Sequence, residues 1–162
     1  PLPFNIAHLK HAVTRQTRRY ASFRDIDIYG SFDRVQGRIL HEEDRAFLNR
    51  MLEIIQQNIF KPELSTQAIA SQMGLSKTTF YNRIGALTSR SPATIIKELR
   101  LSYAERLLVQ TKLSIDEIIY KSGFVNRSTF FRNFTARYGC TPKVYREQRL
   151  SELTQSAAKT AE

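Results

Sequence analysis

From about residue 43 onward, apolar residues recur every three to four positions, which is the period of an amphipathic helix. The first stripe covers residues 43–59, and acidic residues precede it where a helix N-terminus favours negative charge. Further segments with this period are separated by glycine, proline or serine. The pattern predicts an all-α chain with seven helices, at residues 43–59, 65–73, 77–88, 91–110, 114–122, 127–138 and 141–149.

The predicted helix starts carry side chains that can cap a helix. An oxygen-bearing N-cap residue accepts a hydrogen bond from a backbone N–H of the first turn. The predicted caps are Ser65, Ser76, Ser91, Ser114, Asn126 and Thr141. Ser114 and Glu117 also have the spacing of a capping box. Residues 150–162 are small and polar, so they are predicted to form a flexible tail.

One motif occurs twice along the chain. A Leu-Ser pair, an isoleucine, a glycine, a phenylalanine and a Ser/Thr-Pro pair recur at an offset of 49 residues up to the glycine and 50 after it. One residue is therefore inserted in the turn after Gly123. Each copy has the order helix, glycine turn, helix, which is typical of a helix-turn-helix unit. We predict two such units joined by the long helix at residues 91–110.

The charge of the chain indicates the class of partner. The formal net charge is +10, and residues 77–149 hold 14 Lys/Arg against 5 Asp/Glu, so most of the excess lies in the repeat region. Basic surfaces favour polyanions, because neutralising phosphates releases counterions. Two helix-turn-helix units on a basic chain predict double-stranded DNA as the partner.

The second helix of each unit is expected to enter a major groove. Phe80 and Ile84 in one unit, and Phe130 and Phe134 in the other, have the spacing of a buried face. The opposite faces are predicted to contact bases: Thr78, Tyr81, Asn82, Arg127, Ser128, Phe131 and Arg132. Arginine suits guanine, asparagine suits adenine, and phenylalanine can meet a thymine methyl. Phosphate contacts are predicted at the helix starts: Ser76, Lys77 and Asn126.

These assignments have alternatives. An outward arginine can be a solvated charge or a phosphate contact, and Asn82 can be ordinary surface. Phe131 can be a satellite of the core instead of an exposed aromatic. Gly85 weakens its helix by about 1 kcal/mol relative to alanine, either to permit a close backbone approach or without functional meaning.

Enzymatic residue patterns are not visible in the sequence. His8, His11 and His41 all precede the repeats, and the first two have no third ligand nearby. Cys140 is the single cysteine, which favours a buried thiol and a reducing compartment. There is no Gly-rich phosphate loop and no run of 18 apolar residues. We therefore expect a cytoplasmic, non-enzymatic protein that needs no cofactor or metal.

Residues 44–149 resemble the DNA-binding module of AraC/XylS-type bacterial transcription regulators. The second unit matches at residues 118–124 and 130–146, and the first at residues 69–81, with the joining helix at 91–108. The resemblance implies two recognition helices in successive major grooves, with base contacts at the outward positions given above. The chain departs from the family at Ile119, where alanine is usual, so helix 114–122 is expected to pack farther from helix 127–138.

A weaker resemblance lies at residues 1–20, which are similar to the last helix of a response-regulator receiver domain. Residues 21–42 would then be a linker, and an unrelated amphipathic helix is the alternative. The chain begins with Pro1, so we expect a fragment of a longer protein. The resemblance implies an output domain of a two-component or hybrid system that could be anchored in the inner membrane.

Partners and rival functions follow from the same analysis. We expect a homodimer, if one forms, to depend on upstream regions, and RNA polymerase is a possible partner. One rival function is a non-specific architectural nucleic-acid binder, which would show apolar wedges and little sequence preference. The other rival is a protein-interaction adaptor.

Overall fold

The computed structural model describes residues 41–161, so the predicted helix at residues 1–20 and nearly all of the predicted linker at 21–42 lie outside the described part. Contacts divide the chain after Ala46, and residues 47–162 form the larger unit. The described residues form seven helices and no strand, which confirms the all-α prediction. The helices are α3 (Glu42–Asn58), α4 (Thr66–Gln72), α5 (Lys77–Thr88), α6 (Pro92–Gln110), α7 (Ile115–Lys121), α8 (Arg127–Tyr138) and α9 (Pro142–Thr160).

The six predicted N-caps are confirmed. In each, the side-chain oxygen accepts a hydrogen bond from the backbone N–H three residues later. The capping box is complete, because Glu117 also accepts from the backbone N–H of Ser114 at 2.8 Å. A cap of this kind contributes about 1 kcal/mol to helix stability. Local side-chain chemistry therefore sets where these helices begin.

In the first helix-turn-helix unit, α5 packs against α3. Phe80 and Ile84 of α5 are fully buried, as predicted from their spacing. The ring of Phe47 on α3 lies 6.1 Å from the ring of Phe80, centroid to centroid. The guanidinium of Arg83 covers the Phe47 ring at 4.0 Å. These contacts hold the inner face of α5 against α3 and leave its other face outward.

The second unit has its own core, built largely from aromatic rings. Phe130 and Phe134 of α8 are fully buried, as predicted, and their ring centroids lie 5.6 Å apart. Phe134 also meets Tyr145 of α9 edge-on at 5.6 Å. Ile119 is buried in this same core. The large side chain at this position therefore contributes to the second core.

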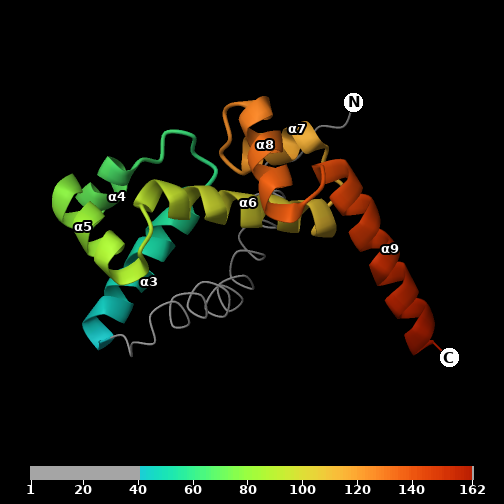
Figure 1. Cartoon of the computed structure of the whole chain (residues 1–162), viewed down its shortest axis with the longest axis horizontal. Coiled ribbons are helices and arrows are strands. Elements are labelled where there is room, and N and C mark those ends of the chain that lie inside the picture. The colour runs from blue at the N-terminus through green and yellow to red at the C-terminus, as the bar shows by residue number, and fades with distance from the viewer. Residues whose placement is uncertain (1–40, 162) are drawn as a thin grey trace. The chain divides into compact units, whose positions relative to one another are not determined.

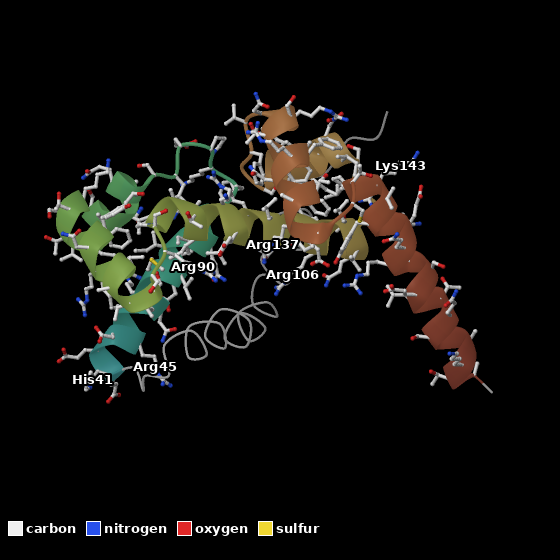
Figure 2. All side chains as sticks on the ribbon, in the orientation of Figure 1. His41, Arg45, Arg90, Arg106, Arg137 and Lys143 are labelled. Atoms are coloured by element: carbon white, nitrogen blue, oxygen red, sulfur yellow. The ribbon has the colours of Figure 1, made fainter. Side chains whose placement is uncertain are left out.

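Helix α6 belongs to both units. Figure 1 shows α4 and α5 near one end of α6, and α7 and α8 near the other. Its C-terminal half contributes four residues to the second core: Leu101, Ala104, Leu107 and Leu108. Figure 2 shows Arg137, which extends from α8 and donates hydrogen bonds to the Glu98 carbonyl (3.4 Å) and the Ser102 hydroxyl (3.0 Å) of α6. Helix α8 is therefore hydrogen-bonded directly to α6, the helix that joins the two units.

The predicted end of the last helix at residue 149 is wrong, because α9 continues to Thr160. Residues 150–160 contain leucine, glutamate, glutamine, alanine and lysine, which favour helix, and no glycine or proline that would end it. Their side chains are exposed, so this extension gains little from packing. The other predicted helix ends agree with the structure to within one or two residues.

Candidate nucleic-acid interface

Two glycine turns place the helices predicted to enter DNA, α5 and α8, which we call the recognition helices. Gly74 and Gly123 have φ values of 70° and 78°, a left-handed conformation that favours glycine. Equivalent backbone hydrogen bonds close both turns, from Leu75 N to Ala70 O and from Phe124 N to Ile119 O. The two copies therefore share one turn geometry, and the inserted residue of the second copy follows it.

The outward face of α5 is polar and uncharged beyond its first residue. Thr78, Tyr81 and Asn82 are all exposed, and Tyr81 retains 50% of its accessible surface. Lys77 is the first residue of the helix and is also exposed. The structure thus brings these four predicted site residues together on one face. Their contacts with DNA remain a prediction.

The outward face of α8 is cationic. Arg127, Ser128 and Arg132 are exposed, as predicted. Neither α5 nor α8 contains an aspartate or glutamate. A pair of helices without carboxylates can approach phosphates without like-charge repulsion. The two faces differ in character: that of α5 suits hydrogen bonding, and that of α8 suits charge.

Arg127 has intramolecular partners that the sequence did not predict. Its guanidinium forms an ion pair with the Asp116 carboxylate on α7. It also lies 4.8 Å from the centroid of the Phe131 ring. Asp116 and Arg127 are on different helices, so helical periodicity gives no signal for this pair. The contacts hold the arginine at the start of α8, where it is still 58% exposed.

Phe131 is only partly exposed and packs against the second core. Its ring meets the buried Phe130 edge-on at 5.8 Å. The alternative of a core satellite therefore describes this residue better than a fully outward aromatic. Its ring lies between the core and Arg127, and it supports the arginine by a cation–π contact. A thymine contact by Phe131 stays a prediction.

Two of the predicted phosphate contacts, Ser76 and Asn126, are also the N-cap residues of α5 and α8. Ser76 Oγ accepts from Thr79 N at 3.1 Å, and Asn126 Oδ1 accepts from Thr129 N at 2.9 Å. The Asn126 cap uses the amide oxygen, so the amide nitrogen is not required for it. Early N–H groups of a helix have no intrahelical acceptor and favour anions. Both starts are therefore compatible with a phosphate.

Arg146 of α9 closes the connection that precedes α7. It donates from Nε to the Leu108 carbonyl at 2.9 Å and from Nη2 to the Leu113 carbonyl at 2.7 Å. Desolvation by burial lowers the pKa of Arg146 from its ordinary value. The residue lies 33 to 38 positions from its acceptors, so its role could not be read from local spacing. Arg146 therefore links α9 to the end of α6 and to the connection that leads into α7.

Residues 41–161 contain no group of three His, Cys, Asp or Glu side chains that could hold a metal ion. Within the same range, no helix has the length and apolar character needed to cross a bilayer.

Comparisons with known proteins agree with this geometry. Residues 69–148 match the family described as a helix-turn-helix domain. Over 109 residues, 67% of this chain, the sequence is 32% identical to histidine kinase P4 of Formosa agariphila, and it covers 8% of that protein. It is also 32% identical over 115 residues, 69% of this chain, to the transcriptional regulator ExsA of Pseudomonas aeruginosa, of which it covers 41%. The chain therefore spans less than half the length of these curated relatives.

A solved structure matches at the level of the fold. It is a transcriptional regulator from Chromobacterium violaceum, described as a protein containing an AraC-type DNA-binding domain. The match covers 67% of this chain and 96% of that one, with a TM-score of 0.62 and 29% sequence identity.

Proposed function

Because this chain carries an AraC-type helix-turn-helix domain of DNA-binding transcription regulators, we propose that it binds a bipartite DNA sequence through α5 and α8 and thereby regulates transcription. The main support for this proposal is that two equivalent helices, each following the same glycine turn, present exposed faces and contain no aspartate or glutamate. One helix, α6, joins them. Two successive major grooves on one side of DNA would receive them.

The outward residues have distinct proposed roles. On α5, Tyr81 and Asn82 contact base edges, with Asn82 suited to adenine, and Lys77 neutralises a phosphate. On α8, Arg127 and Arg132 contact guanine. The remaining members of the proposed site are Thr78, Ser128 and Phe131 at bases, and Ser76 and Asn126 at phosphates. Polar and cationic faces of this kind make the two halves unequal contributors to specificity.

The wider context is also a proposal. Similarity to a histidine kinase, together with the receiver-like sequence at residues 1–20, supports an output domain in a two-component or hybrid system. Such a domain would act in the cytoplasm, where the chromosome lies, and would not itself be an enzyme. Dimerisation through upstream regions, and contact with RNA polymerase, would follow from that context.

Selection from a random DNA pool, followed by competition, tests the proposed function. The selected sequence should compete for binding far better than random DNA of equal length, by about 10³-fold or more at physiological salt. Equal affinity for the two DNAs would instead indicate an architectural binder. A protein-interaction adaptor would instead show no DNA binding. It would bind a protein partner strongly, and this binding would persist in the Arg127→Ala and Arg132→Ala variants.

A further inference from the structure

The turn before α8 lies against the end of α3, whereas the equivalent turn before α5 does not have such a neighbour. A Cβ built on Gly123 would lie 2.3 Å from the carbonyl oxygen of Ile59 and 2.9 Å from Nε of Arg100. A Cβ built on Gly74 would meet nothing within 4 Å. Both glycines have positive φ, so the turn conformation alone explains glycine at both positions. The close approach is specific to Gly123, where the second unit touches the first.

Arg100 of α6 lies beside Gly123 and the segment Ile59–Lys61, and we call the contacts among these residues the junction. Its Nε donates to the Ile59 carbonyl at 3.3 Å, and its Nη2 donates to the Lys61 carbonyl at 2.7 Å. The acceptors lie 41 and 39 residues away in the sequence. Desolvation by burial lowers the pKa of the guanidinium. Hydrogen bonds from a charged donor are stronger than neutral ones. Both acceptor carbonyls lie just beyond the C-terminal end of α3.

We infer that Arg100 is a positioning residue, which fixes the second recognition helix relative to the first and so sets the spacing of the two DNA half-sites. The inference rests on the proposed function. Gly123 precedes the Asn126 cap of α8 by three residues, so a shift of the Ile59–Lys61 segment would be transmitted to the start of α8. Without the junction, the relative placement of the two units would depend on α6 and on its contacts with α5, α7 and α9.

A distance measurement without DNA tests the junction itself. Ala86 of α5 and Ala136 of α8 are exposed and occupy equivalent positions in the repeat. Spin labels at Ala86→Cys and Ala136→Cys, in a Cys140→Ser background, report the distance between the recognition helices by pulsed electron paramagnetic resonance. We expect Arg100→Met to broaden or shift the distance distribution. Lys97→Met removes the same charge from an exposed position on α6 and should leave it unchanged. An unchanged distribution in Arg100→Met would overturn the inference.

Half-site spacing tests the consequence for DNA. One inserted base pair rotates a half-site by about a tenth of a turn, so a rigid reader should lose affinity for it. We expect the affinity of wild type for DNA with the selected spacing to be about tenfold higher than for DNA with one inserted base pair. A factor of this size lies within the usual range of coupling between two binding sites. Arg100→Met and Gly123→Ala should reduce this preference to about twofold while keeping wild-type affinity for a single half-site. If the Arg100→Met variant is folded and keeps the wild-type spacing preference, the inference is contradicted.

Matched variants separate this role from general destabilisation. Gly74→Ala introduces the same backbone strain as Gly123→Ala without the close contact, so it should keep the spacing preference. If Gly123→Ala does not fold, as judged by circular dichroism, Arg100→Lys gives the comparison. It keeps the charge but cannot reproduce the guanidinium geometry, and should show an intermediate preference. If wild type binds selected and random DNA equally, the proposed function fails, and the distance measurement still decides whether the junction fixes the helices.

Discussion

At the scale of single residues, two arginines of α8 have different surroundings. Arg127 contacts Asp116 and Phe131, whereas Arg132 is exposed on the next turn of the same helix. We expect Arg127→Ala and Arg132→Ala each to weaken binding to the selected DNA by about 1–3 kcal/mol and to relax specificity at one base pair. Binding titrations against DNAs that differ from the selected sequence at one base pair measure both the loss of affinity and the loss of specificity. Lys159→Ala, with the same charge loss at the far end of α9, is the control; an equal effect there would contradict base contact.

Glu117 gives a pH-dependent prediction at the same scale. The hydrogen bonds from Ser114, backbone first and then side chain, lower the pKa of the Glu117 carboxyl in the folded state. Its stabilising effect is therefore complete above the pKa of the carboxyl in the unfolded chain, and it is lost as pH falls through the lower pKa of the folded state. Urea titrations should show wild type more stable than Glu117→Gln at pH 7, with the difference disappearing in strong acid. A difference that grew on acidification would contradict the capping role.

At the scale of elements, α9 consists of two parts with different energetics. Tyr145 is buried and donates from its hydroxyl to Glu105 at 2.6 Å, so the first turns are anchored to α6. Residues 150–160 are exposed. Truncation after Arg149 should change the free energy of unfolding by no more than about 0.5 kcal/mol. The helical signal at 222 nm should fall in proportion to the residues removed. A loss of stability above 1 kcal/mol would show that the extension packs on the rest of the chain.

At the scale of the whole molecule, the net charge of +10 predicts strongly salt-dependent DNA binding. The logarithm of the association constant should fall linearly with the logarithm of salt concentration. Lys77→Ala should reduce the slope by about one and weaken binding to selected and random DNA alike. Asn82→Ala should leave the slope unchanged and weaken binding to the selected DNA. Identical slopes for wild type and Lys77→Ala would remove Lys77 from the phosphate contacts.

The sequence by itself determined the features that depend on neighbours three or four residues away. Ser76 and Ser114 cap helices through the backbone N–H three residues later, and Gly74 permits a turn that other residues disfavour. Phe130 and Phe134 are buried because their spacing puts them on one face of α8. Such effects are local, so the helix starts, the two units and the outward faces were predictable. The end of α9 was not, because residues 150–160 are polar and no local stop signal marks where the helix ends.

Only the tertiary structure decided which distant groups meet. Asp116 and Arg127 pair across two helices, and Arg100 binds carbonyls about 40 residues away beside Gly123. Glycine at position 123 has the same local explanation as at position 74, so the sequence did not distinguish the packed turn from the open one. Hydrogen bonds between distant segments depend on how whole helices pack, and no periodicity records that. The sequence therefore determined the two recognition helices, and their packing decided how one is held relative to the other.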